Sequence, residues 1–520
     1  MIRKITDFFI KNIYQIFLLL IVIVFFIVNF YDLRYKISLN SNLNKYYVVF
    51  ILLSIILSIV VFILCKRADN FSDEKIPKIF VLSAIILGAI YLSLSPLFTG
   101  SDEHNHFYRI YEISDGVIVT PTNKVVGSEM PVSLSDTFVV GSGNNSNIKY
   151  DNLRQMWDVR LDRSNKVQYG DLWTNAYNNT ALYSPVQYLP QVIGFSIAKT
   201  FNFGPYLIGV FGRVFNLAFY ILLGYFCLKL IPKSKIFYML ILLSPNMLQC
   251  ATTLSADAFT NVIFLLLVSL IFKICYSKNK IDKREKFLLL ILCVIISLCK
   301  IVYLPIVFLI LLINSNLFKN GNKEKIIFSS ITILLSVLIS FLWMGCTNGV
   351  FEIAYDQTEF QKQFILNNLL NYFIVFVRTF SCYIIKYVEC LFVGTTMFHS
   401  QLKMPALISF FYVILIVLSL LKDEEKRNLN ISKRIIIGMV GIVIVGLIST
   451  AIYVQCTAQY YSIGNATIEG IQGRYFIPII MLIPFVFQFR NIKLKKQNLY
   501  IGALFVNLIT WFYMINQFIA

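Results

Sequence analysis

Acidic, basic and imidazole side chains gather in residues 99–109 (TGSDEHNHFYR), directly after a long apolar run. A short helix through this segment places Asp102, His106 and Arg109 on one face, because residues three and four apart are neighbours. Glu103 projects about 100° away from that face. A carboxylate with histidine and arginine beside it is typical of a general base in a polar pocket. We therefore predict Asp102 or Glu103 as a catalytic base, and an interfacial helix with solvated charges is the alternative.

Charged residues also interrupt four apolar runs. They are Arg213 (GRVFN), Asp257 (LSADAFTN), Lys300 (LCKIVYLP) and Arg474 (QGRYFIP). A charge inside a bilayer is costly and usually faces a polar cavity. Three of the four are cations, which suit an anionic phosphate head group. We predict that all four surround one phosphate-binding site at the outer leaflet beside Asp102, and snorkelling of each side chain to the interface is the alternative.

The segment Tyr183–Gln191 (YSPVQYLPQ) interleaves tyrosine and glutamine with two prolines. The prolines prevent one straight helix, so we expect an irregular segment that lies on the bilayer or dips into it. Tyr183 and Gln187 are candidate substrate contacts from this segment, and a plain connector is the alternative.

No cofactor is certain from the sequence. Asp102 and His106, four residues apart, could bind a divalent cation, but two ligands are weak evidence for a metal site. The sequence has no phosphate loop, no HExxH pair and no serine elbow. The connectors expected in the cytoplasm are too short to hold a nucleotide-binding domain. Any reaction would therefore use a donor presented in the membrane.

A strongly apolar chain must position these residues. Of its 520 residues 58% are hydrophobic and 14% are charged, whereas about a quarter of a soluble protein is charged. Apolar runs of about 18 or more residues recur, and each can span a hydrocarbon core about 30 Å thick. The predicted class is an all-α polytopic membrane protein with about 11 to 14 spans, which excludes soluble enzymes, disulfide scaffolds and disordered proteins. The candidate spans are residues 12–30, 46–65, 78–98, 206–231, 236–253, 255–276, 287–300, 303–318, 327–345, 404–421, 435–455, 474–489 and 498–517.

The net charge of +19 indicates topology rather than a nucleic-acid partner, because Lys and Arg are enriched in cytoplasmic loops of membrane proteins. With the N-terminus in the cytoplasm, the third span ends near Phe98 and residues 99–183 form a long extracytoplasmic loop. That loop holds ten acidic and seven basic residues, so it is net negative within a basic chain. The stretches 184–202 and 367–396 are apolar but interrupted, and they fit spans, surface helices or re-entrant pieces equally.

The sequence SDEHNHFYRIYEISDG resembles the signature DE-x-x-H-F-x-R-x-Y-x-x-S-x-G of a bacterial membrane-protein family of unknown function, which is grouped with the GT-C glycosyltransferase superfamily. Further similar motifs follow in order: VGSEMP, YSPVQYLPQ, GRVFN, SPNMLQCATTLSADAFTN, KIVYLP and QGRYFIP. The resemblance covers about residues 78–490, and an ordered set of motifs is more specific than any single one.

The resemblance implies an inverting glycosyltransferase with a GT-C-like bundle and a large outer loop. Such enzymes take a sugar from a polyprenyl-phosphate carrier in the membrane and place their catalytic acid in the first large outer loop. Here that residue is Asp102 or Glu103, and the acceptor is a cell-envelope glycan or lipid-linked saccharide. In many GT-C enzymes this loop follows the first span, whereas here it follows the third. Residues 1–65 are then an accessory hairpin, 66–490 the core and 491–520 a C-terminal helix.

Roles for other residues follow from the chemistry of such a transfer. Arg474, Arg213 and Lys300 would stabilise the departing lipid phosphate, and Arg109 would orient the base. Four aromatic residues are candidates to stack on sugar rings, with structural packing as the alternative: Trp157, Trp173, Tyr183 and Tyr188. There are two competing functions: a transporter or flippase for lipid-linked saccharides, and a noncatalytic assembly factor. The expected location is the bacterial cytoplasmic membrane, with the site facing outside.

Overall fold

The computed structural model describes residues 2–38, 45–67, 71–122, 126–131, 134, 167, 172–174, 177–393, 404–421, 429–487 and 494–519. Within these ranges the chain is almost entirely helical. The long helices are α1 (Ile2–Ser38), α2 (Lys45–Arg67), α3 (Ile76–Leu94), α9 (Pro205–Leu230), α12 (Asp257–Tyr276), α13 (Lys283–Cys299), α14 (Gly321–Cys346), α17 (Leu369–Glu389), α18 (Ala406–Leu420), α19 (Ile431–Ile452) and α23 (Lys496–Ile519).

Shorter elements connect and interrupt the long helices. They are α4 (Glu103–Ser114), α7 (Asn178–Ala181), η3 (Pro185–Tyr188), α8 (Leu189–Thr200), α10 (Lys235–Leu242), α11 (Pro245–Ala251), η4 (Ile301–Leu312), η5 (Ser315–Leu317), α15 (Asn348–Ala354), α16 (Thr358–Asn367), η7 (Tyr453–Thr457), α20 (Ala458–Tyr460), η8 (Gly473–Phe476), α21 (Ile477–Ile480) and α22 (Ile483–Val486). The strands β1 (Glu129–Pro131) and β2 (Leu172–Thr174) form one antiparallel pair.

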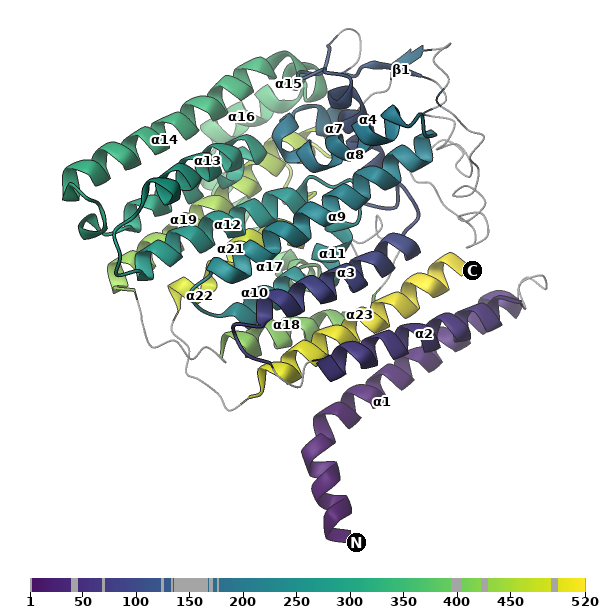
Figure 1. Cartoon of the computed structure of the whole chain (residues 1–520). Coiled ribbons are helices and arrows are strands. Elements are labelled where there is room, and N and C mark those ends of the chain that lie inside the picture. The colour runs from purple at the N-terminus through teal and green to yellow at the C-terminus, as the bar shows by residue number, and fades with distance from the viewer. Residues whose placement is uncertain are drawn as a thin grey trace.

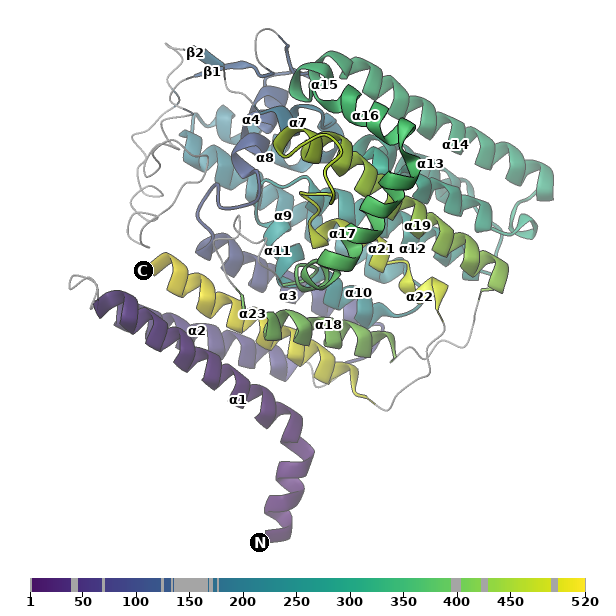
Figure 2. The ribbon, with the colours of Figure 1, turned by 180° about the vertical axis from the view of Figure 1, so that it is seen from behind.

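Among the described residues, nine helices are long and apolar enough to cross a membrane, and three shorter apolar helices accompany them. The predicted class of all-α polytopic membrane protein is confirmed. Most long helices run in nearly the same direction, and α4, α7, α8, α15 and the strand pair gather at one end of the bundle (Figures 1 and 2). We call this end the α4 end.

Basic connectors meet one another at the opposite end. Lys286 pairs with Glu324 across the start of α14, and Lys433 Nζ donates to Asn314 Oδ1 at 2.6 Å. Figure 1 shows the start of α13 and of α14 far from the α4 end. The chain therefore separates its basic connectors from the polar segment that follows α3.

Three predicted spans are not single helices. Residues 236–253 form α10 and α11, separated at Ser244–Pro245. Residues 303–318 form the 3₁₀ helix η4 and the short η5, and 474–489 break into η8, α21 and α22 at two prolines. Proline removes a backbone donor and clashes with the preceding turn, which explains the breaks at Pro245, Pro478 and Pro484, whereas Pro305 lies inside η4. These three candidate spans are therefore helical but interrupted.

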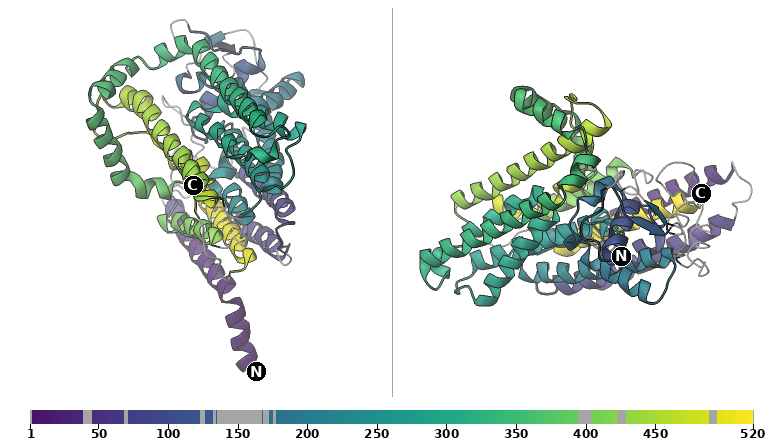
Figure 3. Two further views of the ribbon diagram at one scale, coloured as in Figure 1. Left: turned by 90° about the vertical axis from the view of Figure 1, so that its left-hand side faces the viewer. Right: turned by 90° about the horizontal axis from the view of Figure 1, so that it is seen from above.

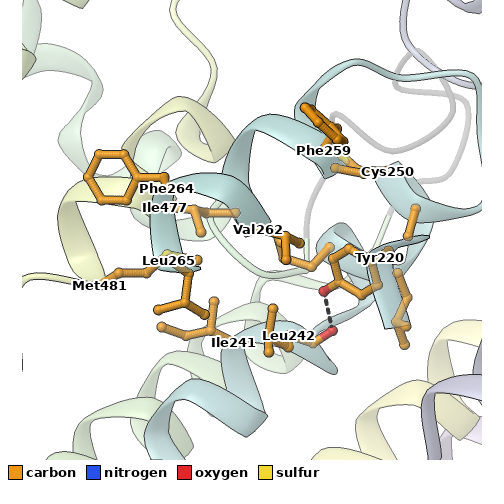
Figure 4. Packing of buried hydrophobic residues seen from close by; sticks show 14 of the residues in the cluster. Tyr220, Ile241, Leu242, Cys250, Phe259, Val262, Phe264, Leu265, Ile477 and Met481 are labelled. Carbon is orange, nitrogen blue, oxygen red and sulfur yellow. Dashed lines mark hydrogen bonds between the residues drawn. The ribbon is translucent and has the colours of Figure 1, made fainter. Parts of the chain in front are cut away.

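Side chains satisfy the carbonyl groups that these breaks leave open. Tyr220 donates its hydroxyl to the carbonyl of Leu242 at 2.6 Å, within closely packed apolar side chains (Figure 4). Tyr238 reaches the carbonyl of Met481 at 2.8 Å, and Asn507 reaches that of Leu243 at 3.1 Å. A buried backbone group without a partner is costly in a bilayer, so these bonds permit irregular backbone in the core.

The two ambiguous stretches have different outcomes. Residues 184–202 form η3 and then α8, and α8 has 12 residues, about 18 Å of helix, which is too short to cross the bilayer. Helix α8 packs closely on α9, because a Cβ on Gly194 would lie 2.5 Å from the carbonyl oxygen of Phe211. Helix α17 is long and mostly exposed, and it crosses the direction of the other long helices (Figure 2).

The N-terminal hairpin, α1 and α2, lies alongside α23 (Figures 1 and 3). A buried polar contact joins the first and last helices near the α4 end. Asn516 Nδ2 donates to Asn29 Oδ1 at 3.2 Å and to Asp32 Oδ2 at 2.8 Å. Segments from the two ends of the sequence thus pack together.

Candidate functional site

Asp102 lies in the turn directly before α4 rather than on a face of the helix. Its backbone is left-handed, with φ 54° and ψ 21°, a conformation that Asp and Asn tolerate better than most residues. Its charge acts on His106 and Arg474 and also on Tyr355 and Tyr460. The position of the Asp102 carboxylate therefore depends on this left-handed turn and not on the spacing of residues along α4.

Glu103 and Arg213 form a closed ion pair. Arg213 donates Nε to Glu103 Oε1 and Nη2 to Oε2, both at 2.6 Å. It also donates to two backbone carbonyls just after α3, each at 2.8 Å. Glu103 accepts two backbone N–H groups at 2.9 and 3.0 Å. Both side chains are buried and have their hydrogen-bonding groups occupied, so the structure places Arg213 in a structural pair and not among free cations.

Asp257, Lys300 and Arg474 come together from three different elements. Asp257 opens α12, Lys300 separates α13 from η4, and Arg474 lies in η8. Lys300 Nζ lies 2.5 Å from Asp257 Oδ1, and Arg474 Nε lies 3.2 Å from Oδ2. The three side chains keep 13%, 15% and 8% of their surface exposed. We call these three residues the cation cluster, since two positive charges face one carboxylate.

Aromatic rings surround the Lys300 ammonium group. Its nitrogen lies 5.5 Å from the ring centre of Tyr183 and 5.3 Å from that of Tyr475. Tyr183 stacks on His106 with ring centres 6.1 Å apart, and His106 Nδ1 shares a hydrogen bond of 2.7 Å with the Tyr188 hydroxyl. Tyr183 is thus part of this site, and Tyr188 positions the imidazole.

His106 is neutral at ordinary pH. Burial lowers its pKa from 6.5 to about 4, although the nearby charges of Asp102 and Asp257 oppose this shift. Lys300 and Arg474 lower the pKa further. The charges of Asp102 and of the three residues of the cation cluster therefore all act on the His106 imidazole.

Gln187 faces the first turn of α12. Its Oε1 accepts a hydrogen bond from Thr260 at 3.4 Å, whereas its Nε2 is buried without a hydrogen-bond partner among the described residues. Gln191, one turn later, donates to the carbonyl of Ser255 at 3.2 Å. The two glutamine side chains thus contact the chain on either side of Asp257, at Thr260 and at Ser255.

Arg109 belongs to a different network. It forms an ion pair with Glu112 and donates to two backbone carbonyls. Glu112 also accepts from Thr120 and Tyr177, each at 2.5 Å, and from Ser128. All of these groups are buried. Arg109 therefore ties Ile118, Thr120 and Tyr183 to α4, and its guanidinium group is occupied by the protein.

Sequence reasoning missed Glu112 and Tyr475. Glu112 was counted only as one of the loop's acidic residues, although its position three residues after Arg109 signals an ion pair on α4. Tyr475 follows Arg474 directly, and its ring lies 5.6 Å from the guanidinium carbon. Trp157 lies outside the described residues, and Trp173 lies in β2 opposite Met130.

The residues of this site fit an anion better than a metal ion. The described part of the chain holds no group of three or more His, Cys, Asp and Glu side chains that could bind a metal. Asp257 already faces two cations, and Asp102 and His106 would supply two ligands at most.

The family of predicted membrane proteins designated DUF2142 matches residues 85–483 of this sequence. The chain belongs to this family. The description of DUF2142 records a membrane protein and no activity. Comparison with curated proteins and with solved structures finds no match.

The DUF2142 match has a clear relation to the structure. It includes α4, the closed ion pair and all three residues of the cation cluster, and it leaves out α1, α2 and α23. The helices outside the match are those that pack against one another along the side of the bundle (Figure 3). The candidate site thus lies entirely within the part that defines the family.

Proposed function

We propose that this DUF2142 protein is a membrane glycosyltransferase of the GT-C type. It would transfer a sugar from a polyprenyl-phosphate-linked donor to a cell-envelope glycan or lipid-linked acceptor. The observation that carries the proposal is the cation cluster, in which Lys300 and Arg474 face the single carboxylate of Asp257 beside Asp102. The ordered motifs that resemble a GT-C-grouped family support the same reaction.

The cation cluster is suited to hold a phosphate. Its two positive charges are only partly compensated by the one carboxylate. Its side chains are mostly buried, but part of each remains accessible. Preorganised cations in a poorly hydrated site stabilise developing negative charge strongly. The leaving phosphate of a lipid-linked sugar departs as an anion, so it needs this stabilisation more than it needs a proton.

Asp102 is the better candidate for the base. Glu103 has both oxygens occupied by Arg213 and by backbone N–H groups, so it has no position left for an acceptor hydroxyl. In the proposed step Asp102 takes the proton of the acceptor hydroxyl, and the hydroxyl oxygen bonds to the anomeric carbon. The bond from that carbon to the phosphate oxygen breaks, and the phosphate keeps the electron pair near Lys300 and Arg474. Attack opposite the leaving group inverts the anomeric configuration.

The charge distribution supports an outward-facing site. Basic connectors gather at the end opposite α4, and basic loops are enriched in the cytoplasm. The α4 end and the cation cluster would then face the outside of the bacterial cytoplasmic membrane, with the N-terminus inside. A lipid-linked donor could keep its polyprenyl chain in the bilayer while its phosphate reaches the site.

The test uses the purified full chain in lipid nanodiscs with polyprenyl-phosphate sugars and candidate saccharide acceptors. General-base catalysis contributes about 10² to 10⁴ in rate, so Asp102→Asn should lower the transfer rate by that factor. Asp115→Asn is the matched control, because Asp115 ends the same helix, is 55% exposed and pairs with Lys199. Equal transfer by Asp102→Asn and the control would exclude Asp102 as the base.

A vesicle assay separates this reaction from transport. A flippase moves the intact lipid-linked saccharide across the membrane and needs no acceptor, whereas a transferase releases polyprenyl phosphate only as the sugar is transferred. Movement of intact donor without release of polyprenyl phosphate would replace the proposed function with transport. A chain that does neither while binding the donor would indicate an assembly factor.

A further inference from the structure

A groove outside the proposed site runs between α1, α2 and α23. Its volume is about 730 Å³, within the range of about 300–1,000 Å³ that is usual for ligand pockets. All three helices contribute apolar side chains to its walls, among them Phe26, Phe62 and Phe505. The pocket is therefore built by the two ends of the sequence, and the helices of the DUF2142 match do not line it.

Polar groups occur at only a few places in this groove. Ser54 lines it from α2, and the Ser54 hydroxyl is buried without a hydrogen-bond partner among the described residues. Lys66 and Gln497 line the end of the groove where α2 ends and α23 begins. A long apolar channel with a charged group at one end has the layout of a phospholipid, with hydrocarbon along the walls and a head group at the end.

The charged end favours an anionic head group. Lys66 lies 4.9 Å above the ring of Phe62 and forms no ion pair with another described residue. Lys496, directly before Gln497, pairs with Asp73 at 2.7 Å. Among the described residues, the Lys66 ammonium group thus has no carboxylate partner at the groove, and basic pockets between membrane helices on the cytoplasmic side bind the phosphates of acidic lipids.

We propose that this groove holds one anionic phospholipid. An acyl chain lies between α1, α2 and α23, and the lipid phosphate binds the ammonium group of Lys66. The lipid joins the N-terminal hairpin to the C-terminal helix, and it does so independently of any sugar transfer. A lipid without net charge can occupy the same groove but brings no net negative charge to Lys66.

Lipid retention by the full chain tests this proposal. Detergent-purified protein is incubated with phosphatidylglycerol or phosphatidylcholine, and bound lipid is counted by native mass spectrometry. We expect phosphatidylglycerol to be retained at least tenfold better, and Lys66→Gln to remove that preference. Lys229→Gln is the matched control, because Lys229 also lies over an aromatic ring, that of Tyr225, but does not line the groove.

A second variant tests the position of the acyl chain. Ser54→Phe places a ring inside the groove and should abolish retention of phosphatidylglycerol while the protein stays monodisperse with a cooperative thermal transition. Retention that persists in Ser54→Phe would place the lipid elsewhere and overturn the proposal. Equal retention of the two lipids by the unmodified chain, or equal effects of Lys66→Gln and Lys229→Gln, would overturn it as well.

Discussion

Two neighbouring groups of buried charges differ in how completely the protein compensates them. Glu103 and Arg213 share two hydrogen bonds of 2.6 Å, and backbone groups occupy their remaining positions. In the cation cluster, Lys300 and Arg474 share one carboxylate, and part of each side chain stays exposed. Each group sets arginine against a carboxylate, and Lys300 adds a second cation to the cluster.

The difference indicates which group is structural. A saturated buried pair loses stability when one partner is removed, because the other charge is left uncompensated. A cluster with an excess charge can accept an anionic ligand with little rearrangement. Compensation, rather than burial or residue type, therefore separates the scaffold from the candidate site.

The largest expected effect comes from breaking the closed pair. Arg213→Met leaves the Glu103 carboxylate buried and alone, which should lower the free energy of unfolding by about 3–5 kcal/mol. Thermal unfolding of the detergent-purified protein measures this loss. The control Lys199→Met removes a more exposed pair with Asp115 and should cost about 0–1 kcal/mol. Adding Glu103→Met to Arg213→Met should recover much of the loss, and a further loss would contradict the closed-pair description.

Removing one cation from the cluster should affect activity more than stability. Lys300→Met leaves Asp257 paired with Arg474, so unfolding should change less than in Arg213→Met. Loss of one electrostatic group at a reacting centre lowers rates by about 10² to 10³, and we expect that factor in initial rates of transfer. Lys273→Met, which alters an exposed pair with Glu285, is the control. Equal transfer rates of Lys300→Met and Lys273→Met would show that Lys300 does not contribute to catalysis.

His106 should make stability depend on pH. Between pH 6.5 and about 4 the unfolded chain binds a proton that the folded imidazole does not bind, because burial lowers the pKa of His106. The free energy of unfolding should therefore be at its full value above pH 6.5. It should fall by up to about 3 kcal/mol as the pH drops towards 4. Thermal unfolding at stepped pH measures this fall. His106→Gln should flatten the profile over that interval, and an unchanged profile would show that another group titrates.

The smallest expected effect comes from the hydrogen-bond network around Glu112, which is structural and separate from the cation cluster. Tyr177 donates to Glu112 at 2.5 Å and accepts from the backbone N–H of Ser128 at 3.0 Å. Tyr177→Phe should cost about 1–3 kcal/mol and should increase proteolysis at the α4 end. Tyr461→Phe, at a tyrosine that is 61% exposed, should leave cleavage unchanged. Similar cleavage of the two variants would remove the anchoring role of Glu112.

The helical membrane class and many spans could be predicted, because apolar runs carry that information directly. The sequence also indicated that Asp257, Lys300 and Arg474 belong together, since charges in apolar segments need a shared polar environment. It did not separate Arg213 from them. Position along a span cannot reveal that the bonds to Arg213 are already filled by Glu103 and by carbonyls after α3.

Backbone details of the site also lay beyond the sequence pattern. Helical spacing predicted a common face for Asp102, His106 and Arg109, but the left-handed turn at Asp102 precedes the helix. Hydropathy also predicted continuous spans where prolines break them. At the break after α10, a tertiary contact, the bond from Tyr220 to the carbonyl of Leu242, satisfies a backbone group that hydropathy does not reveal.

The packing of the hairpin against α23 has a consequence for synthesis. Helices α1 and α2 find their partner α23 only when the chain from Arg67 to Lys496 has been made. At about 5–20 residues per second this interval is roughly 20 to 90 s. During that time α1 and α2 are surrounded by lipid, which their exposed apolar side chains suit. The bundle can therefore close along this side only after α23 has been made.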